Sequence, residues 1–171
     1  NMDMRDVKEF VKDASKYLVI ALLVLIVFVY VVSFQQVVGP SMTPNYEEGE
    51  VFLLNKLKYR ISDVKRFEVI VLESEQSKYM IKRVIGLPGE HIEYKENKLY
   101  IDGKEIEEDF VRNGETEDYN IEVLEVDVIP EDSYFVVGDN RINSQDSRSY
   151  GFISKEDIVG KVEFRIWPIF K

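Results

Sequence analysis

The amino-acid sequence predicts a mainly β protein of coiled, antiparallel sheets that is attached to one N-terminal transmembrane helix. Two observations lead to this fold class. An uncharged apolar run near the N-terminus is long enough to cross a bilayer. The rest of the 171-residue chain contains short segments rich in β-branched and aromatic residues, most of them bounded by Gly, Pro, Asn or Asp. This remainder is about the size of one domain.

The transmembrane segment is predicted at residues 17–36. Its core, YLVIALLVLIVFVYVVSF from Tyr17 to Phe34, has no charge and no proline. As a helix these 18 residues span about 27 Å, close to the thickness of the hydrocarbon core of a bilayer. The following sequence offers no small-residue cleavage site, which favours an uncleaved signal anchor over a removed signal peptide. A buried core helix is the alternative interpretation.

Basic residues predict the orientation of this anchor. Four of them precede the apolar run: Arg5, Lys8, Lys12 and Lys16. The first basic residue after the run is Lys56. The positive-inside rule then makes residues 1–16 a cytoplasmic segment, residues 17–36 the anchor and residues 37–171 an extracytoplasmic domain. The predicted location is the cell membrane, as a single-pass protein with the lipid bilayer as a partner.

Seven stretches after the anchor have the composition of strands. In chain order they are EVFLLNKL, FEVIVLES, KYMIKRVIG, HIEYKEN, KLYIDG, SYFVVGDN and KVEFRIW. Two hairpin turns are predicted, one at Glu96-Asn97 and one at Asp102-Gly103. A brief helix is expected after Ser154, with Asp157 three residues beyond this N-cap. Residues 104–128 are acidic and weakly patterned, which indicates a peripheral insertion or small subdomain.

Composition excludes several classes of function. The formal net charge of −10 argues against a nucleic-acid partner, because phosphate binding needs a basic face. The chain has no cysteine, which excludes thiol catalysis and zinc–thiolate sites. His91 is the single histidine, and it lies early in a predicted strand like an ordinary structural residue. The carboxylates show no ligand spacing, so no metal is expected, and the serine–lysine chemistry considered below requires no cofactor.

Two residues are candidates for chemistry. Ser41 lies in GPSMTP, where Pro40 restricts the backbone and the N–H of the serine is available to face an oxyanion. The alternative is a stiff connector that happens to contain a serine. Lys82 lies in YMIKRVIGLPGE, and strand alternation gives it the same face as Met80 and Val84. Burial there would lower its pKa toward that of a base, whereas an edge-strand lysine would face water.

A dense polar loop, VVGDNRINSQDSRSYG, follows a predicted strand. Ser144 is a candidate for orienting an amine, and Asp146 with Arg148 is a candidate for bracing the loop through a charge-assisted hydrogen bond. The alternative is a solvated loop with Asx turns.

Together these stretches resemble the type I signal peptidases, the membrane-bound leader peptidases of bacteria. The resemblance is collinear through the anchor, GPSMTP, YMIKRVIGLPGE, GDNRINSQDSRSYG and IVGKVEFRIWP, and the single anchor is similar to the compact Gram-positive form. It implies the signal peptidase/LexA-like fold and a serine protease that removes signal peptides from exported preproteins. Ser41 would be the nucleophile and Lys82 the general base. Ser144 would orient the lysine, and a salt-bridge group would stand nearby: Asp146, Arg148 and Arg83.

The resemblance also implies how a substrate is held. A preprotein would pair as an added strand with backbone near Val37–Gly39 and Tyr79–Ile81. Small residues at its −3 and −1 positions would enter shallow pockets walled by Val37, Met42 and Ile81. Some relatives have a serine where this chain has Gly39, so the second donor to the oxyanion stays open. Another departure is Ile142, because relatives often have an acidic residue there.

Two other classes stay open on the sequence. A self-cleaving regulator of LexA type would share the serine–lysine pair, although a transmembrane helix occupies the place of its DNA-binding domain. A non-catalytic, membrane-anchored β module is the other possibility, and a protonated, exposed Lys82 would favour it.

Overall fold

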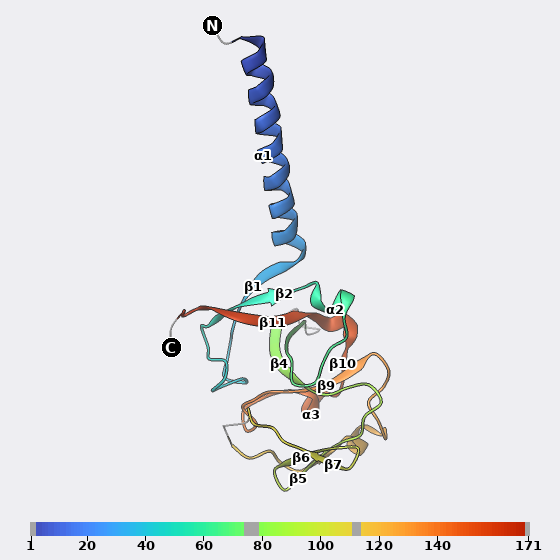
Figure 1. Ribbon diagram of the computed structural model, residues 1–171. Helices are drawn as coiled ribbons and strands as arrows, with labels where there is room; N and C mark the ends of the chain where they lie inside the picture. Colours follow the sequence, from blue (N-terminus) through green and yellow to red (C-terminus); the bar gives the residue numbers. More distant parts are fainter. Residues whose placement is uncertain (1–2, 74–78, 111–113, 170–171) are drawn as a thin grey trace.

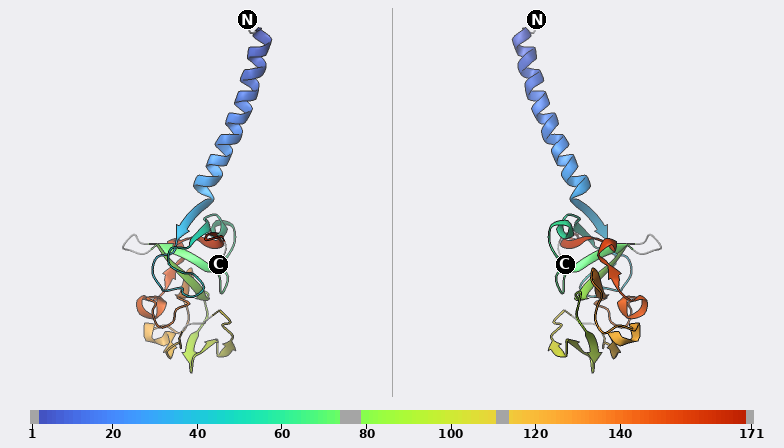
Figure 2. Two further views of the ribbon diagram at one scale, coloured as in Figure 1. Left: turned by 90° about the vertical axis from the view of Figure 1, so that its left-hand side faces the viewer. Right: turned by 90° about the vertical axis from the view of Figure 1, so that its right-hand side faces the viewer.

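One long N-terminal helix extends away from the strands that form most of the chain (Figure 1). The structure, a computed structural model, describes residues 3–73, 79–110 and 114–169. Helix α1, Met4–Tyr30, begins after Asp3, whose main-chain N–H donates to the Asp6 side chain over 3.2 Å. None of its residues is buried, and its length and composition are sufficient to cross a membrane. Two further views show the same separation of α1 from the β domain (Figure 2).

The C-terminal end of α1 differs from the prediction. The helix ends at Tyr30, short of the predicted boundary at residue 36. Residues 32–36 form strand β1, which pairs antiparallel with β2. The reason is that Val32 and Phe34 favour extended backbone, and the neighbouring edge of β2 supplies the hydrogen bonds that another helical turn would have made.

The larger sheet contains seven of the described strands, in the order β1-β2-β11-β3-β4-β9-β10, and all of its pairs are antiparallel. Its strands are β1 Val32–Gln36, β2 Val51–Asn55, β3 Val69–Glu73, β4 Tyr79–Gly86, β9 Ser133–Val137, β10 Ile153–Ser154 and β11 Ile158–Trp167. Two short helices lie in its connections, α2 Lys58–Ile61 and α3 Ser147–Tyr150. Strand β11 pairs with both β2 and β3, with register shifts against each.

The smaller sheet has the order β7-β6-β5-β8 among the described strands and lies at the end of the domain opposite α1 (Figure 1). Its strands are β5 Ile92–Lys95, β6 Lys98–Ile101, β7 Lys104–Ile106 and β8 Tyr119–Asn120. Both predicted hairpins are confirmed. The turn residues Glu96 and Asn97 have φ of 51° and 63°, and Asp102 and Gly103 have φ of 51° and 76°.

All seven predicted strand stretches contain a strand, and the acidic segment at 104–128 contributes to the smaller sheet. It supplies β7, β8 and the 3-10 helix η1, Ile121–Leu124. Ile121 is fully buried in the core. The Asn45 side chain donates to the carbonyl oxygen of Phe110 over 2.7 Å. The segment is therefore part of the packed domain, and its acidic residues are mostly exposed.

The brief helix after Ser154 is present as one 3-10 turn, η2 Lys155–Asp157. The Ser154 hydroxyl accepts a hydrogen bond from the N–H of Glu156, one residue earlier than the predicted capping partner Asp157. The difference is within ordinary N-cap geometry, because the cap oxygen accepts from the N–H of either the second or the third helical residue.

Strand β4 separates two clusters of the hydrophobic core. Ile81 packs in a cluster with Val37 and Met42, and Val84 packs in another with Ile70 and Leu72. Alternate β4 side chains thus enter different clusters, as the period of a strand requires. A polar side chain on the Val84 face of β4 is therefore surrounded by apolar side chains.

Candidate active site

Ser41 and Lys82 lie in direct contact. Lys82 is near the middle of β4, and Ser41 follows the Gly39-Pro40 turn that leaves β1. The Nζ atom of Lys82 donates to Ser41 Oγ over 2.8 Å. Lys82 is only 3% exposed, so the lysine end of this hydrogen bond is shielded from solvent, whereas Ser41 is half-buried. The two residues that sequence reasoning singled out are thus brought together across 41 positions of chain.

Burial lowers the pKa of Lys82 from 10.5 to about 8. Desolvation is the main cause, because removing water disfavours the charged ammonium. The positive charge of Arg148 lowers the pKa further, whereas the negative charges of Asp146 and Asp139 raise it. The amine therefore becomes neutral near the pH range in which most enzymes work, and it is then able to accept a proton.

The face of β4 follows the predicted alternation. Val84 is fully buried, and Met80 packs against the same cluster, so Lys82 lies between two apolar neighbours on its own strand. Ile81 and Arg83 point to the other side, where Ile81 joins the cluster of Val37 and Met42. Lys82 is therefore buried, although no carboxylate among the described residues lies at ion-pair distance from its Nζ.

The loop that follows β9 holds the segment that carries Ser41. The main-chain N–H of Asn140 donates to the carbonyl oxygen of Ser41, and its side-chain Nδ2 donates to the carbonyl oxygen of Pro40, both over 3.0 Å. Asp139 contributes as well, since its N–H contacts Met42 Sδ at 3.5 Å. The sequence showed Asp139 and Asn140 as polar residues of the loop but did not indicate a role for them. Their place in the GDN motif directly after a predicted strand was the signal for such a role.

Gly138 is required by close packing in this loop. A Cβ atom at this position would lie 2.5 Å from the carbonyl oxygen of Ser41 and 2.2 Å from Ser144 Oγ. Both distances are shorter than real Cβ contacts allow. The missing side chain is therefore what lets the loop approach the serine, and this role was not predicted from the sequence.

Arg83 and Asp139 form a buried ion pair on the side of the site away from Lys82. Nε and Nη2 of Arg83 donate to the two carboxylate oxygens of Asp139 over 2.8 and 2.6 Å. The guanidinium also lies over the ring of Phe110, 4.1 Å from its centroid. Asn45 donates to Asp139 over 2.8 Å from the Ser41 segment. The resemblance grouped Arg83 with Asp146 and Arg148, but the structure gives Arg83 this separate partner.

Asp146 and Arg148 form the second ion pair near the site. Arg148 donates to both carboxylate oxygens of Asp146 over 2.9 Å, and Gly138 N–H donates to Asp146 over 3.0 Å. Burial by itself raises the pKa of the Asp146 carboxyl, but the hydrogen bonds and charge of Arg148 and the Gly138 N–H outweigh it, so the pKa is lowered. The predicted brace is present. Through the N–H of Gly138 it holds the loop where Gly138 packs against the carbonyl oxygen of Ser41.

Ser144 does not make the contact that the resemblance implies. Its Oγ is buried and has no hydrogen-bond partner among the described residues, so no bond to Lys82 is formed. The reason for the difference is the main-chain position of the loop, which packs Ser144 against Gly138.

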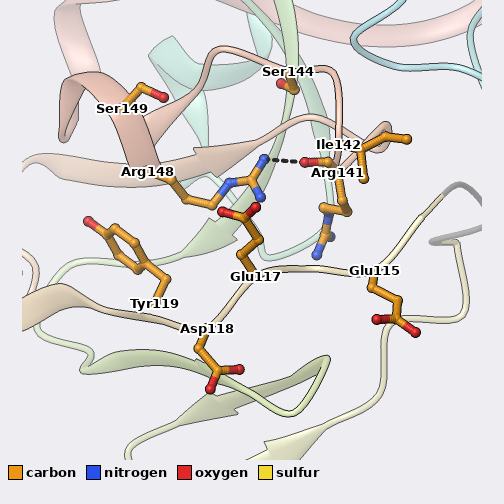
Figure 3. Close-up of a pocket in the computed structure, with 9 residues that line it drawn as sticks. All are labelled: Glu115, Glu117, Asp118, Tyr119, Arg141, Ile142, Ser144, Arg148 and Ser149. Atoms are coloured by element: carbon orange, nitrogen blue, oxygen red, sulfur yellow. Dashed lines mark hydrogen bonds between the residues drawn. The ribbon is translucent and has the colours of Figure 1, made fainter.

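Behind this loop lies a polar cavity of about 340 Å³ (Figure 3). Ser144, Ser149 and the guanidinium of Arg148 are at one side of it, and acidic side chains of the 104–128 segment lie opposite. The acidic residues are Glu115, Glu117 and Asp118. Ile142, the position at which relatives often carry an acidic residue, is on the rim and 72% exposed.

The predicted substrate-contacting residues differ in burial and in backbone conformation. Val37, Met42 and Ile81 are buried together in one core cluster beside the Ser41 segment. Tyr79 is 53% exposed at the start of β4. Gly39 has a φ of +80°, a left-handed conformation that favours glycine.

His91 directly precedes β5 of the smaller sheet. The Nδ1 atom of His91 is 2.7 Å from the carbonyl oxygen of Asp127, in the smaller sheet's surroundings. Within residues 3–73, 79–110 and 114–169, no group of three or more His, Cys, Asp or Glu side chains is arranged to hold a metal ion.

A mainly β domain with a buried lysine bonded to a serine defines the class of peptidases with a serine–lysine site. The family model described as signal peptidase, peptidase S26, matches residues 8–167, and the chain belongs to this family.

Relatives of known type share most of the chain. Signal peptidase I of Bacillus caldolyticus is 42% identical over 148 residues, which cover 81% of both chains. Signal peptidase IB of Staphylococcus aureus is 33% identical over 174 residues, covering 94% of this chain and 91% of the relative. The crystal structure of a signal peptidase I from Enterococcus faecalis V583 matches with a TM-score of 0.56 at 37% identity, covering 60% of this chain and 99% of that chain.

Proposed function

We propose that this protein is a membrane-anchored serine endopeptidase that removes N-terminal signal peptides from exported preproteins, with Ser41 as nucleophile and Lys82 as general base. Cleavage would follow small residues at the −3 and −1 positions. The single observation that carries the proposal is the 2.8 Å contact between Lys82 Nζ and Ser41 Oγ, with the lysine almost fully buried. Membership of the signal peptidase family supports the substrate class.

The reaction uses the pair twice. Neutral Lys82 accepts the hydroxyl proton of Ser41 while Oγ attacks the carbonyl carbon of the scissile bond. The lysine then gives this proton to the leaving amine, which frees the mature chain and leaves the signal peptide as an ester on Ser41. Lys82 next accepts a proton from water, the resulting hydroxide attacks the ester carbon, and Ser41 recovers its proton as the signal peptide leaves.

The negative charge that develops on the substrate oxygen needs donors. Within the described part of the chain the N–H of Ser41 has no hydrogen-bond acceptor, so it is free to donate to this oxygen. Gly39 has no side chain to add a second donor. The second donor is therefore assigned to backbone or to water.

The open edge of β4 supports a site for an extended substrate. Residues 79–81 pair with β3 on one side, whereas β9 begins to pair with β4 only at Arg83. A preprotein segment that adds as a strand would use this edge. On the opposite wall, the N–H and carbonyl of Val37 are already bonded to Glu50 and Gly49. On that wall a substrate strand would therefore pair with the main chain of Val38 and Gly39. The side chains of Val37, Met42 and Ile81 would line the apolar pockets.

We assign the N-terminal segment before residue 17 to the cytoplasm and the β domain to the outer side of the cell membrane. The charge distribution beside α1 supports this orientation. The C-terminal end of β11 supports contact with the bilayer, because four large apolar side chains there are exposed by 40–71%. They are Phe164, Ile166, Trp167 and Ile169. An exposed apolar patch that includes tryptophan suits the interface between membrane and water.

The test is processing of a purified preprotein by the full-length chain in detergent or vesicles. Ser41→Ala and Lys82→Ala are expected to abolish cleavage, and Lys82→Arg is expected to be equally inactive because a guanidinium keeps its proton at working pH. Lys104→Ala, at an exposed position of β7, is the control and should cleave normally. Near-normal cleavage by the Ser41→Ala or the Lys82→Ala variant would refute the assignment of these residues as nucleophile and general base.

A further inference from the structure

The end of α1 lies where a membrane helix meets the water-facing domain. The last carbonyl groups of a helix lack partners inside the helix, and leaving them unpaired is costly near a bilayer. Only Val31 separates α1 from β1. Of the terminal carbonyls, Val27 accepts the N–H of Val31 over 2.9 Å. The following residues are already in strand β1, so their N–H groups do not continue the helical ladder.

Lys56 supplies partners to this helix end from a different part of the chain. Its Nζ donates to the carbonyl oxygen of Val29 over 2.5 Å, and its main-chain N–H donates to the carbonyl oxygen of Val31 over 2.8 Å. One residue thus caps two carbonyls, one in the last turn of α1 and one in the link to β1. It also brings a positive charge to the negative end of the helix dipole, which has no basic residue in its own last turn.

The main chain around Lys56 is held firmly by the β domain. Asn55, the last residue of β2, pairs directly with Val32, the first residue of β1. The Asn55 side chain also accepts the N–H groups of Leu57 and Lys58, each over 3.1 Å. Lys56 is therefore fixed on both sides by a turn that belongs to the catalytic domain, and its side chain reaches from this turn to the helix.

We propose that Lys56 is a positioning residue that fixes α1 relative to the β domain and thereby sets the location of the active site over the bilayer. The proposal rests on the proposed function. A preprotein reaches the site while its signal peptide is still in the membrane, so its scissile bond has a defined height above the bilayer. The site must hold the same height, and a loose joint at Tyr30–Val32 would spread the site over many positions. A short water-soluble peptide has no such constraint.

The experiment compares two substrates of the full-length chain in lipid vesicles: a membrane-inserted preprotein and a water-soluble peptide with the same cleavage sequence. Lys56→Met is expected to lower kcat/KM for the preprotein at least fivefold and to leave kcat/KM for the peptide within twofold. Lys56→Arg, which keeps a charged donor, should restore most of the preprotein activity. Lys58→Met removes a neighbouring charge from the same turn and should match the wild type on both substrates.

A distance measurement tests the joint itself. The chain has no cysteine, so spin labels attach only at Ser15→Cys in α1 and Lys104→Cys in β7. Lys56→Met is expected to broaden the distance distribution between the two labels, and Lys58→Met is expected to leave it unchanged. An unchanged distribution, or an equal loss on both substrates, would overturn the role of Lys56. Failure of the wild type to cleave the peptide would refute the proposed function instead.

Discussion

The main-chain N–H of Asn140 donates a 3.0 Å hydrogen bond to the carbonyl oxygen of Ser41. The side chain of the same residue donates to Pro40, 100 positions earlier in the chain. One asparagine therefore holds the two residues that set the direction of the Ser41 side chain. Because Lys82 is fixed separately by β4, the 2.8 Å contact between Ser41 and Lys82 depends on how firmly this loop holds the serine.

The first prediction concerns the side-chain half of this clamp. Asn140→Ala keeps the main-chain bond to Ser41 but removes the bond to Pro40. The serine then samples more positions, and we expect kcat to fall roughly tenfold because misplacement of a nucleophile by a fraction of an ångström is costly. KM for a soluble peptide should change by less than about twofold, since substrate binding uses β4 and the apolar pockets.

Asn143→Ala is the control for Asn140→Ala. Asn143 is the same residue type in the same loop, but its side chain is exposed. It should retain wild-type kcat. An Asn140→Ala enzyme with normal kcat, or with a loss confined to KM, would show that the side-chain bond to Pro40 does not position the nucleophile.

The second prediction concerns Gly138, which directly precedes the ion-paired residue Asp139. Gly138→Ala forces a Cβ atom to within 2.5 Å of the Ser41 carbonyl oxygen, so the serine or the loop must move. We expect kcat to fall by about 100-fold or more. Overpacking should also lower the free energy of unfolding by about 1–3 kcal/mol.

Gly160→Ala separates these two effects. Its Cβ atom would lie 2.5 Å from the carbonyl oxygen of Asn55, a matched backbone clash on β11, which β3 separates from β4. It should destabilise the protein by a similar amount in a urea titration while the folded enzyme keeps its kcat for a soluble peptide. Equal losses of kcat in both variants would mean that Gly138 matters only for folding.

Local signals in the sequence were sufficient for much of the fold. The Glu96-Asn97 and Asp102-Gly103 turns formed as predicted, because Asn97, Asp102 and Gly103 are residue types that accept positive φ and both pairs join strands directly. Alternation along β4 likewise placed Lys82 between apolar neighbours, because the period of a strand is fixed and does not depend on distant residues.

Contacts between distant segments were not predictable from such patterns. The helix ends at Tyr30 because β2 offers hydrogen bonds to the residues that follow, and nothing within the uniform apolar run marks this point. Asn45 bonds to Asp139 across 94 positions and to Phe110 across 65. A polar residue in an acidic or turn-rich segment carries no local indication of such a partner.

The third prediction concerns pH and activity. Lys82 has a pKa of about 8, so at pH 7 about one lysine in ten is neutral. The pKa lies below its ordinary value, which means that the base form appears as pH rises through 8. We expect kcat/KM for a soluble peptide to rise about tenfold between pH 7 and pH 9. A flat profile over this range would contradict a lysine base with this pKa.

The fourth prediction concerns the stability cost of the same lysine. Its folded-state pKa of about 8 lies below the ordinary 10.5, so the unfolded chain binds the proton more tightly. Below pH 8 the buried charge therefore costs about 3 kcal/mol. Lys82→Met, which keeps the side-chain length, should raise the free energy of unfolding by up to this amount at pH 7.

The pH dependence of this gain is the check. The gain should shrink as pH rises from about 8 and vanish above about 10.5, where lysine is neutral in both states. Urea titrations of the full-length protein in detergent, followed by circular dichroism at several pH values, measure it. A gain that is independent of pH would mean that Met improves packing and that burial of the charge is not its source.

The last prediction addresses Gly39 and the missing oxyanion donor. Its φ of +80° strains any L-residue, but a Cβ atom there would meet no other atom within 4 Å. Gly39→Ala and Gly39→Ser should therefore lose the same stability, about 1–2 kcal/mol, without a clash. Only the serine adds a hydroxyl two positions before Ser41. We expect Gly39→Ser to have a kcat at least about tenfold above that of Gly39→Ala, because a placed donor stabilises the developing oxyanion. Equal kcat values in the two variants would show that the hole of this enzyme is already complete with backbone or water.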